Sequence, residues 1–212
     1  MHSLRTCFNW SRYSMLVWLV LPLLVLCILS SFPIAITMAQ SQNGWFGYCN
    51  KNIGVDIKYP ASWPRNEQQT PGFPGYRILF QSPDNNAQVI VNVALGNVGN
   101  MPASPDKNAG GAVNSYQNTL NGFQLLHAGP GPPIPSPVST ELYGYTPTYD
   151  LAYTYNDDVQ GPLTTWEVLA SSNTPYNAYS LAFTAPTEYF DTYLPLFQKI
   201  YSSFRIPVLC GF

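Results

Sequence analysis

An uncharged, strongly apolar segment near the N-terminus constrains this chain more than any other feature. Residues 15–39 contain no Asp, Glu, Lys or Arg, and the residues before them include Arg5 and Arg12 but no acidic side chain. As a helix, this segment would extend about 37 Å, which is enough to cross the hydrocarbon core of a bilayer. A basic start, an apolar run and small residues near Thr37 and Ala39 are also typical of a secretory signal.

Two interpretations of residues 1–39 therefore stay open, a cleaved signal peptide and a retained transmembrane anchor. In both, the basic residues favour the inner side of the membrane, so that the chain after about residue 40 lies outside. We expect a leader at 1–39, a polar tether at 40–50 that includes an aromatic segment, and one domain of ordinary size at 51–212. The expected location is extracytoplasmic, either secreted or anchored to the outer face of the cytoplasmic membrane.

The outer domain is poor in charge. Charged residues make up 9% of the chain, against about 25% in ordinary globular proteins. Beyond residue 39 there are seven basic and eleven acidic side chains, so the net charge of this part is −4. This balance excludes a basic nucleic-acid-binding protein, and it argues against electrostatic attraction of the domain to anionic lipid headgroups.

Alternation of apolar and polar residues predicts an antiparallel sheet. Residues 53–59 alternate cleanly, and Pro83, Asp84, Asn85 and Asn86 predict a hairpin turn. Strands are also expected at 77–81, 88–95, 123–126, 138–145, 148–156, 163–171 and 178–185. Residues 65–76 have the composition of turns. The Gly- and Pro-rich segment 129–137 predicts an extended surface loop of polyproline character, with a proline-rich ligand motif as the alternative.

Helical periodicity occurs in two places. Ser104 and Pro105 are typical of a helix N-terminus, and the apolar positions after them recur at helical spacing up to Gly122. Residues 187–204 carry a wide apolar stripe, in which Pro195 predicts either a kink or a helix that begins near it. Helices that follow groups of antiparallel strands indicate an α+β fold.

No catalytic motif occurs in the sequence. His127 is the only histidine beyond the leader, so a histidine zinc site or a Ser-His-Asp triad would depend on it alone. The motifs of lipases, zinc proteases and phosphate-binding loops are all absent from the sequence. We therefore expect a protein that is not an enzyme and that binds no cofactor.

Three less favoured hypotheses give a function to particular residues. Asp157 and Asp158, with Asp150 and Glu141 from the preceding strands, could bind calcium, although their spacing does not match a twelve-residue calcium loop. Glu141 and Glu167 could act as the paired carboxylates of a hydrolase, with Asp158 as a further candidate. The tyrosine-rich segment 143–155, with Trp166, could stack against a sugar or another small ligand.

Two cysteines lie beyond the leader, Cys49 before the first strand of the domain and Cys210 after the last helix. In an oxidising compartment such a pair usually forms a disulfide, so we expect a Cys49–Cys210 bridge that joins the two ends of the domain.

Several segments resemble the PsbP family, whose archetype is an extrinsic protein of the photosystem II oxygen-evolving complex. In the first half these are IGVDIKYPASW at 53–63, PGFPGYRILFQSP at 71–83 and AQVIVNV at 87–93. In the second half they are AYSLAFTA at 178–185, YFDTYLP at 189–195 and IYSSFRI at 200–206. Their order and spacing extend the resemblance over about residues 48–207.

The resemblance implies a Mog1/PsbP-like sandwich, in which helices pack on both faces of an antiparallel sheet. It also implies a non-enzymatic module that is accessory to a membrane complex, here in a prokaryotic exported relative. The partner complex is not identified by the sequence. Some members of the family bind metals, but no matching ligand set is evident in this sequence.

Overall fold

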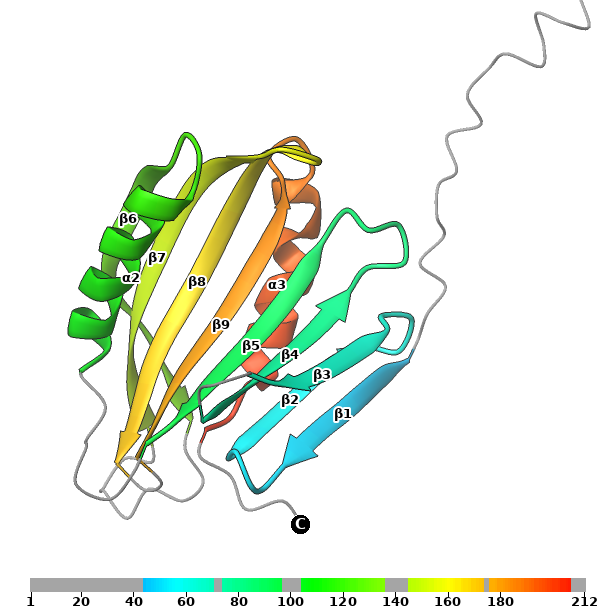
Figure 1. The fold of residues 1–212 in the computed structure, drawn as a ribbon. Coiled ribbons are helices and arrows are strands. Elements are labelled where there is room, and N and C mark those ends of the chain that lie inside the picture. The colour runs from blue at the N-terminus through cyan, green and yellow to red at the C-terminus, as the bar shows by residue number, and fades with distance from the viewer. Residues whose placement is uncertain (1–43, 71–73, 97–103, 136–144, 174–175, 207–212) are drawn as a thin grey trace, which may run out of the picture. The chain divides into compact units, whose positions relative to one another are not determined.

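The structure is a computed structural model that describes residues 44–70, 74–96, 104–135, 145–173 and 176–206 (Figure 1). The expected leader at 1–39, the expected strand start at 138–144, Glu141 and Cys210 all lie outside these ranges. Among the described residues, no helix is long and apolar enough to cross a membrane.

Nine strands and two helices make up the described part of the chain. Their bounds are β1 (Trp45–Asn50), β2 (Val55–Pro60), β3 (Arg65–Gln69), β4 (Gly75–Gln81), β5 (Gln88–Leu95), α2 (Pro105–Thr119), β6 (Gln124–Pro135), β7 (Tyr145–Asp157), β8 (Gly161–Asn173), β9 (Tyr176–Pro186) and α3 (Phe190–Ser203). The helix at 105–119 begins at Pro105 as expected, and the hairpin at 83–86 joins β4 to β5.

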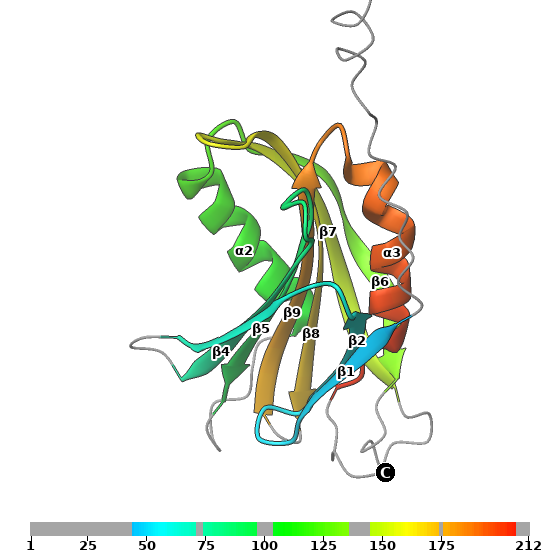
Figure 2. The same ribbon diagram turned by 90° about the vertical axis from the view of Figure 1, so that its right-hand side faces the viewer.

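The strands form two sheets. The larger is antiparallel throughout, in the order β3-β4-β5-β9-β8-β7-β6, and the smaller contains only β1 and β2. Helices α2 and α3 lie on opposite faces of the large sheet (Figure 2). The expected α+β class, with an antiparallel sheet between helices, is therefore confirmed.

The main core lies on the α3 side of the sheet. The apolar stripe of α3 buries Phe197 and Ile200 completely. The ring of Phe197 stacks on Phe183 of β9 and meets Trp166 of β8 edge to face, with ring centroids 5.0 Å and 5.2 Å apart. Pro195 lies inside α3, so the helix begins five residues before it.

The core on the α2 side is smaller. Its fully buried members are Ala109, Leu151, Tyr153 and Leu169. Helix α2 contacts β6, β7 and β8. Because α2 covers one side of the sheet only in part, the same face of β4, β5 and β9 is left open beside it (Figure 2).

Three segments differ from their expected structure. Residues 45–50, expected in a tether, form β1, because their backbone pairs with β2 over the full length of the strand. Residues 65–69, expected as turn, form β3 on the edge of the large sheet, with all five side chains exposed. The expected polyproline loop is in part strand, since residues 129–135 extend β6 along β7. Proline is tolerated there because β6 is an edge strand whose outer side needs no partner.

Replacing Gly131 with Ala should destabilise the protein by about 1–3 kcal/mol, because the new methyl group would overlap a buried carboxylate. A Cβ at this position would lie 2.0 Å from Oδ1 of Asp150 and 2.6 Å from Oγ1 of Thr148. Gly111→Ala in α2 is the matched control, since nothing lies within 4 Å of its Cβ position. That control should stabilise the helix by about 0.5–1 kcal/mol in urea unfolding. Equal effects of the two substitutions would contradict the close approach of β6 to Asp150.

Candidate functional site

A groove of about 350 Å³ lies between α2 and the open face of the large sheet. We call it the α2 groove. Its lining comes from α2, the turn after it and five strands: Arg77, Gln88, Ile90, Asn92, Tyr116, Leu120, Tyr153, Tyr155, Thr165, Glu167, Ala182 and Thr184. On each strand that supplies two or more of them, these residues are two positions apart, which places them on one face of the sheet.

A buried carboxyl group lies at the base of this groove. Glu167 on β8 is 3% exposed, and its Oε2 accepts a hydrogen bond of 2.8 Å from the hydroxyl of Tyr116 on α2. Burial raises the pKa of the Glu167 carboxyl above its ordinary value, and hydrogen bonds from Tyr116, Ser180 and Tyr153 offset part of that rise. The carboxyl group therefore ties α2 to the sheet, and its burial disfavours the ionised form.

Aromatic rings form the helix side of the groove. Tyr116 packs against Tyr153 with ring centroids 5.0 Å apart, and Tyr155 follows at 6.2 Å from Tyr153. Burial is the main cause that raises the pKa of all three phenols. They remain neutral hydroxyl groups at any ordinary pH. This side of the groove can stack against flat or ring-shaped groups and can exchange hydrogen bonds with them.

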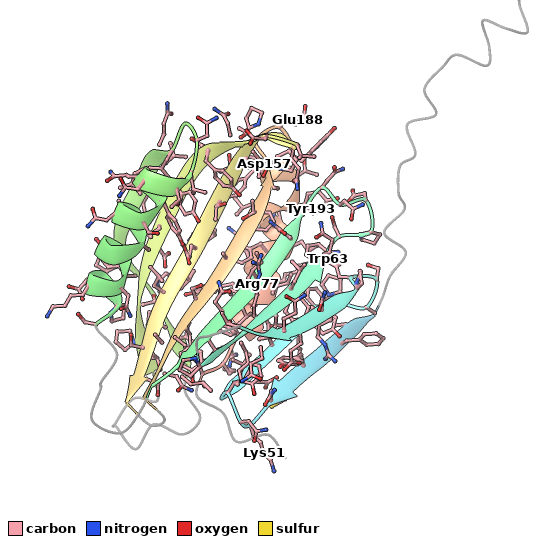
Figure 3. All side chains as sticks on the ribbon, in the orientation of Figure 1. Lys51, Trp63, Arg77, Asp157, Glu188 and Tyr193 are labelled. Atoms are coloured by element: carbon pink, nitrogen blue, oxygen red, sulfur yellow. The ribbon has the colours of Figure 1, made fainter. Side chains whose placement is uncertain are left out.

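The opposite side is polar and carries the one positive charge of the lining. Arg77 on β4 is exposed, and it lies opposite Asn92 of β5 in the strand register (Figure 3). The amide of Asn92 donates a hydrogen bond of 3.1 Å to the hydroxyl of Ser180. Arg77 and the buried Glu167 are thus the one basic and the one acidic side chain of the lining.

The three described residues of the calcium hypothesis, Asp150, Asp157 and Asp158, are not all brought together. Asp157 is the last residue of β7, and its Oδ1 accepts hydrogen bonds from the backbone N–H groups of Gln160 and Val159 in the β7–β8 turn. These bonds lower the pKa of Asp157. Asp158 lies in the same turn. Asp150 is seven residues away along β7, a distance of about 23 Å in an extended strand. Over the described ranges, no three His, Cys, Asp or Glu side chains form a group that could hold a metal ion.

Asp150 itself is buried on the α3 side of the sheet. Its Oδ2 accepts a hydrogen bond of 3.3 Å from the indole N–H of Trp166, and its Oδ1 has no hydrogen-bond partner in the structure. Burial raises the pKa of Asp150, and the hydrogen bond from Trp166 and the nearby His127 lower it in part. The exposed His127 on β6 is thus the one histidine near a carboxylate in the described chain, but it lies on the opposite face from the groove.

The remaining candidates are separated by the fold. Trp166 and Glu167 are consecutive on β8 and point to opposite faces, so Trp166 packs under α3 and is not part of the α2 groove. The hypothesis of one aromatic surface holding both Trp166 and the tyrosines is therefore wrong. Glu141 lies outside the described residues, so a Glu141–Glu167 pair stays a prediction.

Cys49 is exposed on β1 and is disulfide-bonded in the structure. It is the one cysteine in the described ranges, so its pairing with Cys210 stays a prediction.

Comparison with known proteins supports the fold. No protein-family model matches the sequence, and no curated protein matches it either. The solution structure of cyanobacterial PsbP (CyanoP) from Synechocystis sp. PCC 6803 is similar with a TM-score of 0.53 and 14% identity, over 76% of this chain and 92% of that one. LpqN, involved in cell envelope biogenesis of Mycobacterium tuberculosis, is similar with a TM-score of 0.50 and 15% identity, over 78% and 91%. The Ran-binding protein Mog1p of Saccharomyces cerevisiae has a TM-score of 0.45 and 10% identity, over 77% and 95%.

The likeness to CyanoP and LpqN shows that this chain has a PsbP-like fold, as the resemblance in its sequence implied. At such low identity it shows the fold alone.

Proposed function

We propose that this chain is an exported, membrane-associated and non-catalytic binding module, accessory to a membrane complex, which holds a ligand or a partner segment in the α2 groove. The observation that carries the proposal is the burial of Glu167 and its hydrogen bond to Tyr116, without a second carboxyl group beside it in the lining. Glu167 carries the only carboxyl group in the lining, it is 3% exposed, and the hydroxyl of Tyr116 holds it at 2.8 Å.

A hydrolase would need a second acid–base group near this carboxyl. The lining supplies tyrosines, threonines and amides, together with Arg77, and no histidine or cysteine. Tyrosine rings beside amide and hydroxyl groups suit recognition of a small polar ligand or a short segment of a partner, and a sugar is one such ligand. Binding is therefore the function that this groove supports best.

The cellular setting of the proposal comes from the sequence. The leader at 1–39 supports export and association with the membrane. Two proteins that share this fold support the setting. One is a cyanobacterial PsbP, and the other is LpqN, which is involved in cell envelope biogenesis. We extend the setting of LpqN to this chain as part of the proposal.

Photo-crosslinking from inside the groove tests this proposal. A photoreactive phenylalanine analogue at Gln88 should form an adduct with a bound molecule in native membranes. The same analogue at Val159, which is 93% exposed in the β7–β8 turn, is the control and should form none. Asn92→Trp should abolish the Gln88 adduct by filling the groove, whereas Asn114→Trp on the exposed side of α2 should leave it intact.

Two outcomes would contradict the proposal. Adducts from Gln88 that persist in Asn92→Trp would show that the groove is not the binding site. In Glu167→Gln the amide oxygen can still accept the hydrogen bond from Tyr116, so the bound molecule should be the same as in wild type. A cleaved molecule in wild type and an intact one in Glu167→Gln would identify a hydrolase instead.

A further inference from the structure

The edge strand β1 exposes two aromatic side chains at the beginning of the described domain. Trp45 is 41% exposed and Phe46 is 55% exposed. Because they are consecutive in a strand, they point to opposite faces of the β1–β2 sheet, and both flank its free edge. Figure 1 shows β1 as the outermost strand, on the opposite side of the domain from α2.

Most of the basic residues of the domain gather around this strand. Arg65 lies over the ring of Tyr48 in β1, 4.8 Å from its centroid, and the backbone of Arg205 pairs with Asp56 of β2. The backbone N–H of Lys58 donates to Ser203, one turn after Lys199 on α3. With Lys51 in the β1–β2 turn, five of the seven basic residues beyond the leader are here, beside two acidic residues: Lys51, Lys58, Arg65, Lys199 and Arg205, with Asp56 and Glu67.

The acidic residues gather elsewhere. Asp84, Asp157, Asp158, Glu188 and Asp191 belong to the β4–β5 turn, the β7–β8 turn and the start of α3. Figure 3 shows Asp157 and Glu188 at the opposite end of the domain from Lys51. The net charge of −4 is thus unevenly distributed. The expectation that the domain is not attracted electrostatically to anionic lipid headgroups rests on its overall charge, whereas the residues around β1 carry a net positive charge.

The position of β1 in the chain brings this surface within reach of the membrane. Five residues lie between Ala39, at the end of the apolar segment, and Trp45, so the Cα atoms of these two residues can be at most about 20 Å apart. We propose that Trp45 and Phe46 at the start of β1, with the five basic residues distributed along β1, β2 and the elements beside them, dock edge-on onto anionic lipid headgroups; these seven residues are here named the β1 patch. This inference rests on the membrane association in the proposed function, and it adds the side of the domain that meets the lipid.

The chemistry of the β1 patch fits a lipid headgroup layer. Tryptophan is enriched at membrane interfaces, where its ring lies at headgroup level. Each basic side chain near an anionic surface strengthens binding by about fivefold. The acidic residues at the other end of the domain would be repelled from the same lipid surface. Attraction of the β1 patch and repulsion of the acidic residues would therefore favour the orientation in which the β1 patch faces the bilayer. Since α2 lies on the opposite side of the domain from β1, α2 would then lie away from the bilayer (Figure 1).

Hydrogen–deuterium exchange of the full chain in the presence of vesicles tests whether the β1 patch contacts lipid. The measurement can be made whether or not the leader is cleaved. Peptides that cover residues 44–50 should exchange more slowly in vesicles of 30% phosphatidylglycerol in phosphatidylcholine than in pure phosphatidylcholine. The difference should disappear in 0.5 M salt. If the leader is cleaved, sedimentation of the processed protein with the same vesicles should show about 25-fold weaker binding for Lys58→Glu, because this substitution changes the charge by two. The matched control Lys107→Glu, on α2, should bind as wild type does.

Aromatic variants complete the test. Trp45→Ser with Phe46→Ser should remove the protection, and Val159→Ser should not. Equal exchange of residues 44–50 in both kinds of vesicle would overturn the proposal. Protection that depends on protein concentration and not on lipid charge would also overturn it, in favour of strand pairing between two copies. Neither result bears on the Gln88 adduct, so failure of the β1 patch and failure of the α2 groove can be told apart.

Discussion

Replacing Phe197 with Ala should lower the free energy of unfolding by about 3–5 kcal/mol. Phe197 is 0% exposed at the centre of α3. Its ring contacts Phe183, Trp166 and Tyr201, with centroid distances of 5.0, 5.2 and 6.3 Å. These neighbours belong to three different elements that other contacts hold in place, so they can collapse only partly into the cavity, and most of the lost packing is not recovered.

Urea unfolding measures this loss, and the neighbouring Gln198→Ala is the matched control. Gln198 is exposed on the same helix, so its substitution should change stability by no more than about 0.5 kcal/mol. A loss below about 1 kcal/mol for Phe197→Ala would contradict the packing of α3 on the sheet. It would identify the apolar stripe of this helix as an interaction surface.

Periodicity predicted the elements that bury one face. The strand at 88–95 and the hairpin before it agree with the structure because apolar residues alternate there and the turn residues have marked preferences. The alternation in β7 also placed Tyr149, Leu151, Tyr153 and Tyr155 on one face, which is the face that α2 covers. Such patterns can be read from the sequence because the positions that the fold buries are the positions at which apolar residues recur.

The edge strand β3 was not predicted, and the edge strand β6 was predicted only at its beginning, for the opposite reason. β3 has the sequence Arg-Asn-Glu-Gln-Gln and buries no side chain, so only its backbone pairing with β4 makes it a strand. β6 contains four prolines and register shifts near His127 and Ile134, yet it pairs along β7. Most side chains of both strands are exposed, and a sequence pattern built on burial therefore carries little signal for them.

The α2 groove could not be predicted from the sequence, because it is formed by contacts between distant parts of the chain. Glu167 was a candidate because it is a carboxylate in a strand, and Tyr116 belonged to the apolar stripe of a helix. Nothing in either pattern showed that the two would meet at 2.8 Å. Arg77 and Asn92 gave no signal, since exposed polar residues in strands are common. Only the partial cover of the sheet by α2 gives them a shared role.

The predicted Cys49–Cys210 disulfide has the largest expected effect on stability. The described chain brings its end close to Cys49: Arg205 forms a bridge with Asp56, and Asp56 lies opposite Cys49 in the β1–β2 pair. Arg205 is thus two strand spacings from Cys49, about 10 Å, and five further residues can extend up to about 17 Å. Cys210 can therefore reach Cys49 along the sequence that follows Arg205.

Closing a loop of about 160 residues should stabilise the folded chain by roughly 5 kcal/mol through the lost entropy of the unfolded state, although bridges often contribute less. Cys49→Ser, Cys210→Ser and the double variant should therefore lose the same amount of stability, because each removes the same bond. Cys27→Ser in the leader is the control and should change nothing. Non-reducing peptide mapping should recover the Cys49–Cys210 pair. Losses that add in the double variant would show that the two cysteines act separately, since independent sites contribute additively whereas the two halves of one bond cannot.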